Sequence, residues 1–293
     1  MPQSPLNEAL AKLKITDLSS SSGKPLLILE SLFNWSRNYI GNFEDFLGEL
    51  LKTSFWQLQD YLNNPYPALC LGLASSIDIH NRALAPSEPA YHSRKHFQDV
   101  CTAMTVLLAQ EISAARPTND LWQMSREDAW LLLFCAIAHD FGHTGLTNTR
   151  PCELEKISIE KARLFLRQHS ANPALQNDLQ STIEPIILAT DPADLNTLLA
   201  KFTGPNANPT KTDCLSMLMV EADLLASTLP DYGKILGTLL GQEWTNHNPK
   251  AAVSVASDQG RLKFLQNIRF VSPYAIMLGM EDIRKHSIEL LKG

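Results

Sequence analysis

The sequence predicts an all-α protein, folded as a compact bundle of many helices. Apolar residues recur at helical spacing along most of its 293 residues, as in the series Val100, Met104, Leu107 and Leu108. No segment shows the alternating apolar and polar residues of a half-buried strand, and the sequence contains no internal repeat. With 44% hydrophobic residues, the chain can bury one large core, so we expect a single domain over residues 1–293.

The N-terminal part of this domain, residues 1–85, is predicted to contain helices separated by turn-forming sequences. Apolar and aromatic residues at helical spacing predict helices over residues 6–13, 26–58 and 68–82. The second of these is expected to break near Gly41, because glycine is a poor helix former. Stretches rich in serine, asparagine and proline mark the connections at residues 19–23, 63–67 and 85–89.

The remaining part, residues 86–293, carries the residues with candidate chemistry. Helices are predicted over residues 91–112, 125–140, 153–169, 175–189, 214–225, 234–244 and 261–278. Ser125 and Asp128 suit a cap at the start of the second of these helices. Loops are expected at residues 116–120, 141–145, 190–192 and 203–209. The sequence leaves open whether residues 245–260, which are polar at their start, form a mobile flap.

Composition and charge narrow the expected partners and compartment. The net charge is −6 and no Lys/Arg cluster exceeds two residues, so an extended nucleic acid is not an expected partner. Five cysteines without a C-x-x-C pair predict reduced thiols in a cytoplasmic protein. The N-terminus lacks a signal-peptide pattern. The longest apolar run, near residues 129–138, is shorter than the roughly 20 residues needed to cross a bilayer, so no membrane is expected as a partner.

The most informative pair is His139-Asp140, which ends the apolar run at residues 129–138. Such a run predicts a buried helix, and a carboxylate at its end is costly to desolvate unless a charged group pairs with it. A metal ion beside the histidine is the simplest partner. His92 and His96 share one face of the next predicted helix upstream. Mixed nitrogen and oxygen ligands suit Zn²⁺, Mn²⁺, Fe²⁺ or Mg²⁺. The sequence therefore predicts a metallohydrolase, with candidate site residues also at His143 and Asp223.

Four segments, in order, resemble the motifs of one enzyme family. They read Y-H-S-R-K-H-F-Q-D-V at residues 91–100, H-D-F-G-H-T-G-L-T-N at 139–148, L-A-T-D at 188–191 and A-D at 222–223. Their order resembles that of the HD-superfamily metal-dependent phosphohydrolases. The motifs are similar to those of the catalytic domain of class I 3′,5′-cyclic nucleotide phosphodiesterases. The resemblance spans about residues 90–225 and implies an HD/phosphodiesterase-like helical bundle that hydrolyses a phosphodiester such as a cyclic nucleotide.

The resemblance also implies a role for each matched residue. Two divalent metal ions (Zn, Mn, Fe or Mg) are the expected cofactors, with Asp140 bridging them and a bridging hydroxide attacking phosphorus. His92 is the expected general acid for the leaving ribose oxygen, and His143 is expected near the phosphate or the bridging water. The first metal ion is expected on four ligands: His96, His139, Asp140 and Asp223. Three residues are expected in the outer shell of the site: Glu155, Thr190 and Asp191.

The sequence departs from the family pattern where family members read the nucleobase. They place a glutamine before an aromatic clamp with Q-x-x-F spacing. Here Gln266 precedes Phe270, and Gln259 precedes Phe264, at other spacings. Gln266 and Phe270 are the candidate substrate-binding pair. We therefore expect the metal chemistry to be retained, while substrates other than cyclic nucleotides stay open.

Three other functions fit the same residues less well. A phosphomonoesterase or nucleotide hydrolase would use the same site, but a monoester needs less help from an acid such as His92. A catalytically silent HD module for signalling or binding usually lacks metal ligands, and all four are present here. An HD oxygenase needs two redox irons and further ligands. We expect a small phosphoester or cyclic nucleotide as substrate, and the sequence leaves a homo-oligomer open.

Overall fold

The computed structural model describes residues 5–15, 23–59, 61–84, 88–110, 120–170, 173–205 and 207–293. Its regular elements are 16 α-helices and three short 3-10 helices. The residues that it describes contain no strand. The prediction of an all-α fold is therefore confirmed.

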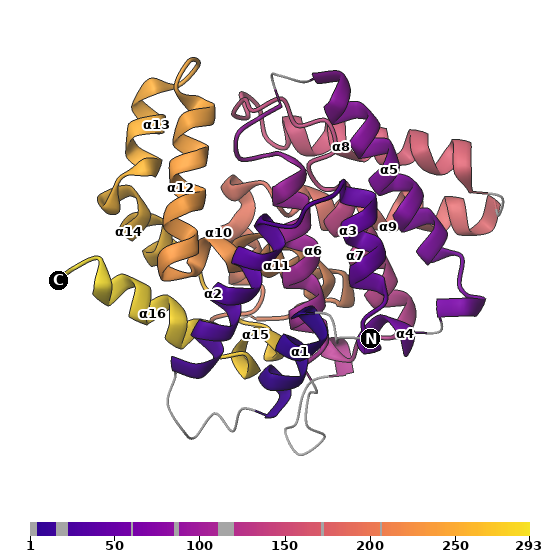
Figure 1. Cartoon of the computed structure of the whole chain (residues 1–293), viewed down its shortest axis with the longest axis horizontal. Coiled ribbons are helices and arrows are strands. Elements are labelled where there is room, and N and C mark those ends of the chain that lie inside the picture. The colour runs from indigo at the N-terminus through magenta and orange to yellow at the C-terminus, as the bar shows by residue number, and fades with distance from the viewer. Residues whose placement is uncertain are drawn as a thin grey trace.

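The helices of the N-terminal half are α1 (Pro5–Ile15), α2 (Gly23–Arg37), α3 (Phe43–Leu51), α4 (Ser54–Gln57), η1 (Tyr61–Asn63), α5 (Tyr66–Leu84), α6 (Arg94–Leu108), η2 (Asp120–Trp122) and α7 (Arg126–Ala138). Those of the C-terminal half are α8 (Glu153–His169), α9 (Pro173–Leu188), η3 (Pro192–Asp194), α10 (Leu195–Ala200), α11 (Lys211–Thr228), α12 (Pro230–Trp244), α13 (Pro249–Ala256), α14 (Asp258–Asn267), α15 (Pro273–Met277) and α16 (Met280–Leu290). Figure 1 shows α6, α7 and α11 in the middle of the molecule, with α12 and α13 side by side at the left.

The core is built around α6, α7 and α11. Every residue of α7 from Ala129 to Ala138 is buried, as is every residue of α6 from His96 to Leu108. α11 packs against α6, α7 and α9. A helix that is apolar on all sides must be surrounded by other helices. The three helices that carry or precede the predicted metal ligands are thus the best-buried helices of the fold.

Most predicted helices of the N-terminal part are confirmed. Residues 6–13 lie within α1, and residues 68–82 lie within α5. The predicted helix 26–58 is divided into α2, α3 and α4, and its first break contains Gly41 as expected. Parts of four predicted connections lie outside the described residues: 19–22, 85–87, 116–119 and 206.

The helix that carries the first histidines begins later than predicted. Ser93 is the N-cap residue of α6, so His92 precedes the helix. The prediction that His92 and His96 share one helical face is therefore wrong. The physical reason is that the N–H groups of Tyr91 and His92 donate to the carboxylate of Glu243 on α12, which holds this segment outside the helix.

The helix before the histidine–aspartate pair starts as predicted and ends slightly earlier. The Ser125 hydroxyl accepts from the N–H of Asp128, and the Asp128 carboxylate accepts from the N–H of Ser125, which makes a capping box. α7 ends at Ala138, and His139 follows as its C-cap residue. Residues 141–145 then form an irregular loop, as predicted.

The predicted helix 261–278 is wrong as a single element, because it is divided into α14 and α15. The carboxylate of Glu221 on α11 accepts from the N–H groups of Val271 and Ser272, so these groups are not available to a helix. Pro273, which follows, has no N–H and suits the first turn of a new helix. A contact from a distant helix thus interrupts a locally favourable pattern.

The other helices of the C-terminal part mostly follow the prediction. α8, α9, α11 and α12 lie where predicted, with ends that differ by a few residues. Residues 245–260, for which the sequence leaves a flap open, contain α13, which packs along α12. α16 lies beyond the predicted helices. Within the described part of the chain, no helix has both the length and the apolar character needed to cross a membrane.

Candidate active site

The four predicted metal ligands come together in the helical core. They lie on α6 (His96), directly after α7 (His139 and Asp140) and on α11 (Asp223). His96 Nε2 is 3.2 Å from His139 Nε2 and 3.1 Å from Asp140 Oδ2. Asp223 Oδ1 is 3.2 Å from His96 Nε2 and 3.8 Å from His139 Nε2. Two nitrogen and two oxygen donors therefore converge on one place.

The end of α7 determines which nitrogen of His139 faces this centre. His139 Nδ1 is 3.0 Å from the carbonyl oxygen of Ala136. Because a carbonyl only accepts, Nδ1 carries the proton and donates it. In the neutral ring, Nε2 then keeps its lone pair, and this nitrogen faces the centre, 3.1 Å from Asp140 Oδ2. Metal-ligating histidines commonly have their second ring nitrogen fixed in this way.

The two carboxylates give this centre a strong preference for positive charge. Burial lowers the pKa of His96, but hydrogen bonds with Asp140 and Asp223, and the charges of both, raise it to about 10. Burial raises the pKa of Asp140, but the charges of His139 and His92 hold it well below its usual range. The positive charge of the imidazoles balances the negative charge of the carboxylates here. A divalent cation bound between neutral imidazoles would supply the same positive charge.

The four donors fit a divalent metal ion. For metal–ligand bonds of about 2.1 Å, neighbouring ligand atoms lie about 3.0–3.4 Å apart. The three distances from His96 Nε2 to its neighbours, 3.1, 3.2 and 3.2 Å, fall in this range. Both histidines are buried, so water competes weakly for their lone pairs. Nitrogen and oxygen donors together suit Zn²⁺, Mn²⁺, Fe²⁺ or Mg²⁺.

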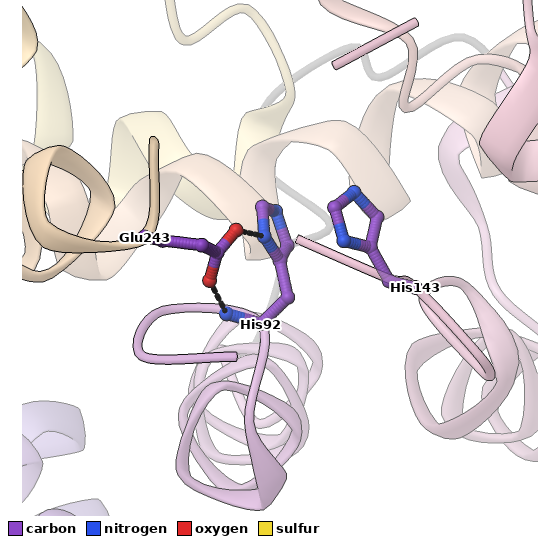
Figure 2. A group of neighbouring side chains, drawn as sticks. All are labelled: His92, His143 and Glu243. Carbon is purple, nitrogen blue, oxygen red and sulfur yellow. Dashed lines mark hydrogen bonds and ion pairs between the residues drawn. The ribbon is translucent and has the colours of Figure 1, made fainter. Parts of the chain in front are cut away.

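Figure 2 shows a second group of neighbouring side chains, His92, His143 and Glu243. His92 Nε2 is 4.0 Å from Asp140 Oδ2. On the other side of the same ring, His92 Nδ1 is 2.5 Å from Glu243 Oε1. The N–H groups of Tyr91 and His92 donate to Glu243 Oε2 at 2.8 and 3.0 Å. Glu243 thus fixes both the backbone and the ring of His92, with Nε2 on the side of the metal ligands.

The ring of His143 stacks on that of His92, with centroids 3.6 Å apart and planes inclined by 25°. His143 Nδ1 accepts the N–H of Gly145 at 3.0 Å, so the neutral ring carries its proton on Nε2. Burial and the charge of His92 lower the pKa of His143 to about 3. In the stacked pair, the His92 ring is bound to the Glu243 carboxylate, and the His143 ring is neutral at physiological pH.

Glu243 is the functional residue that the sequence motifs do not reveal. It lies at the C-terminal end of α12, 151 positions after His92, and outside every recognised motif. Its side chain is only 3% exposed. Burial raises its pKa, but the hydrogen bond with His92 and the charge of that ring hold it below its usual value. No local signal marks this acid, because its role depends on how α12 packs.

Asn148 connects two of the predicted outer-shell residues. Its side-chain amide donates to Glu155 Oε2 at 2.9 Å and to Asp191 Oδ2 at 3.2 Å. Its own carbonyl oxygen accepts from the N–H of Leu154. Burial, with smaller contributions from the charges of Asp191 and Asp140, raises the pKa of Glu155 although the Asn148 amide opposes the shift. Glu155 and Asp191 thus belong to one hydrogen-bond network within electrostatic reach of Asp140.

Three other predicted residues do not join these groups. The Thr190 hydroxyl donates to the carbonyl of Ile187 at the end of α9, so its outer-shell role stays a prediction. Gln266 is exposed on α14. Phe270 is 3% exposed within the hydrophobic core, so its ring has no open face on which a base could stack. The structure therefore does not support an aromatic clamp at Phe270.

Comparisons with known proteins show which family and which solved structures this chain is similar to. Residues 91–233 match the family model of the 3′,5′-cyclic nucleotide phosphodiesterases. No curated protein shows a significant match to the chain. One similar structure is the phosphodiesterase domain of the RhoPDE fusion protein from the choanoflagellate Salpingoeca rosetta. It has 16% identity and a TM-score of 0.56, and the match covers 97% of this chain and 94% of that one.

A second similar structure is the phosphodiesterase domain of Salpingoeca rosetta rhodopsin phosphodiesterase. It has 16% identity and a TM-score of 0.59, and the match covers 97% of this chain and 91% of that one. At this identity the two structures show the shared fold. The family match adds the motifs, because residues 91–233 contain all four converging ligands and His92. The family match and the two similar structures together support a class I 3′,5′-cyclic nucleotide phosphodiesterase-like catalytic domain, and the matched family is one of metal-dependent phosphodiester hydrolases.

Proposed function

We propose that this chain hydrolyses 3′,5′-cyclic nucleotides at the four-ligand centre, with His92 as the general acid. The observation that carries the proposal is the position of the His92 ring. Its Nε2 lies 4.0 Å from the carboxylate of Asp140, while its Nδ1 is bound to Glu243. A proton donor is thus held beside the centre, where the leaving oxygen of a phosphodiester would be.

Two divalent metal ions (Zn, Mn, Fe or Mg) are the proposed cofactors. The four ligands would hold the first ion, and Asp140 would be shared with the second. Such ions, when bound, act as Lewis acids and lower the pKa of water, so that a nucleophile for phosphorus is available at neutral pH. Glu155 and Asp191, joined through Asn148, would orient water around the second ion.

Proton donation by His92 is the proposed contribution of the chain to bond cleavage. As the bond between phosphorus and the ribose 3′-oxygen breaks, this oxygen takes the proton from His92 Nε2, and a 5′-monophosphate is formed. The Glu243 carboxylate stabilises the protonated ring before transfer and fixes its orientation. His92 then regains a proton from solvent.

His143 is assigned a different role from His92. Its pKa is lowered to about 3 by burial and by the charge of His92, so it holds no acidic proton at neutral pH. With Nδ1 accepting from Gly145, its Nε2–H is a neutral hydrogen-bond donor. We propose that this donor stabilises a phosphate oxygen.

A substrate panel tests the proposal. Each common 3′,5′-cyclic nucleotide and a set of phosphomonoesters would be incubated with Mn²⁺ or Mg²⁺ and either the wild-type protein or Asp140→Ala. We expect the wild type to convert cyclic nucleotides to 5′-monophosphates. The variant should lose this activity and keep its helical circular-dichroism spectrum. Turnover of phosphomonoesters alone would favour the nucleotide-hydrolase alternative, and full activity of Asp140→Ala would refute the site.

Two further expectations concern the whole chain. We expect the enzyme to act in a reducing compartment such as the cytoplasm, and the five cysteines, all free and buried, support this. We also expect residues 1–293 to act as one domain. Helices α2 and α3 of the N-terminal part pack against α6, which carries His96, and this packing supports a single unit.

A further inference from the structure

Gly145 lies in the loop after α7 and adjoins two of the three members of the second side-chain group, His143 and Glu243. It is buried and has a φ of 77°, in the left-handed region that favours glycine. Its N–H donates to His143 Nδ1. A Cβ atom at this position would lie 3.1 Å from Cγ and 3.4 Å from Cδ of Glu243. One loop residue therefore lies against His143 itself and against Glu243, the partner of His92.

The N–H of Gly145 determines the state of His143. A backbone N–H can only donate, so His143 Nδ1 must present a lone pair to it, and the neutral ring must carry its proton on Nε2. This N–H points back at a residue only two positions earlier in the loop. Without this bond, the two neutral tautomers of His143 would be free to exchange.

Because Gly145 has no side chain, the Glu243 side chain can occupy the space next to it. The space that a Cβ would occupy is bounded by Glu243 on one side and by Pro89 Cβ, at 3.5 Å, on another. A separation of 3.1 Å is closer than ordinary van der Waals contact between carbon atoms. Any atom beyond Cβ would compete with the Glu243 carboxylate for its position. That carboxylate must stay where it is to bind His92 Nδ1 at 2.5 Å.

We propose that Gly145 is a positioning residue for the stacked pair, His92 and His143. Its N–H sets the tautomer of His143, and its lack of a side chain leaves room for Glu243 to hold His92. This inference rests on the proposed function and adds a reason why the loop after the metal ligands needs glycine at this position. It assigns a specific geometric task to a residue that touches neither metal nor substrate.

The chain offers a matched control for the test. Gly204 also has a left-handed φ, of 96°, but no atom lies within 4 Å of the Cβ that would be added there. Asparagine tolerates the left-handed region better than most residues, so Gly145→Asn and Gly204→Asn carry similar backbone costs. The two variants differ in the contact with Glu243. A second pair, Glu243→Ala with and without Gly145→Asn, asks whether Gly145 acts through Glu243.

We expect Gly145→Asn to lower kcat for a cyclic nucleotide at least about tenfold, because a hydrogen bond to a charged group is disturbed. Gly204→Asn should match the wild type. Bis(4-nitrophenyl) phosphate has a good leaving group that needs little acid, so its turnover should change much less. In the Glu243→Ala background, Gly145→Asn should cause no further loss. This double variant has room for the new side chain, and it keeps the comparison usable if Gly145→Asn alone folds poorly.

Nuclear magnetic resonance of ¹⁵N-labelled histidines gives a readout that does not depend on activity. The wild type should show His143 protonated on Nε2, and a downfield His92 Nδ1 proton that disappears in Gly145→Asn but not in Gly204→Asn. Equal kinetics and equal histidine spectra in the two asparagine variants would overturn the inference, as would a full further loss in the Glu243→Ala background. Absence of phosphodiester turnover in the wild type would instead refute the proposed function, and the spectra would still decide the role of Gly145.

Discussion

Replacing Glu243 by glutamine removes the negative charge beside His92 and keeps the size of the side chain. The carboxylate accepts three hydrogen bonds, from the His92 ring and from the N–H groups of Tyr91 and His92. The glutamine amide oxygen can still accept one or two of these, so the loop at residues 88–93 should stay in place. The variant therefore isolates the electrostatic support of the proposed acid.

The size of the effect follows from the burial of the pair. The side chain of Glu243 is 3% exposed and that of His92 is 14% exposed, so solvent screens their interaction only weakly. A hydrogen bond to a charged group in such surroundings stabilises by about 1.5–3 kcal/mol. If this support is lost before proton transfer, the rate should fall by about 10- to 150-fold.

The assay is steady-state kcat for a cyclic nucleotide and for bis(4-nitrophenyl) phosphate, at fixed Mn²⁺, in the wild type and in Glu243→Gln. The exposed Glu127 at the start of α7 provides a control, Glu127→Gln, that makes the same chemical change away from the site. We expect a large loss on the cyclic nucleotide and a small loss on the activated diester. Equal losses on both substrates would refute the reasoning, because the effect would then not concern the leaving group.

Three further predictions concern the surroundings of the site. Burial raises the pKa of Asp99 to about 6, although the Tyr232 hydroxyl donates to it. Because the pKa is higher in the folded state, the free energy of unfolding should fall as the pH rises from about 4 through 6. Asp99→Asn should flatten this pH dependence when the free energy is measured by urea unfolding. An unchanged dependence of the free energy on pH would contradict the prediction. Asn148→Ala should weaken metal binding by about 10- to 100-fold in a metal titration, and unchanged affinity would count against the network. Gly241→Ala should destabilise the fold by about 1–3 kcal/mol, because its Cβ would lie 2.9 Å from the carbonyl oxygen of Ala252; an unchanged melting temperature would show that α12 and α13 can separate without cost.

Much of the fold could be predicted because the signals for helices are local. The capping box of Ser125 and Asp128 needs only residues three apart, and α8 spans Glu153–His169 as predicted. The positions of the four proposed metal ligands could also be found from the sequence, because each lies in a short motif on or next to a largely buried helix. Their convergence within 3.1–3.8 Å then follows from the packing of α6, α7 and α11.

The parts that could not be predicted depend on contacts between distant segments. Glu221 takes the N–H groups of Val271 and Ser272 away from a helix that the local pattern favours. Glu243 does the same for the segment that contains His92, and in doing so it becomes part of the site. Periodicity within one segment contains no information about such partners, since they are set only when the helices pack.

The metal centre itself can be tested by measuring bound metal and turnover in the same samples. Wild-type protein, His139→Ala and Asp223→Ala would be dialysed, and their metal content per chain would be determined by mass spectrometry before assay with a cyclic nucleotide. We predict that the wild type retains bound transition metal, that both variants lose it, and that turnover falls with metal content. A wild-type protein that turns over cyclic nucleotides without bound or added divalent metal would contradict the proposed centre.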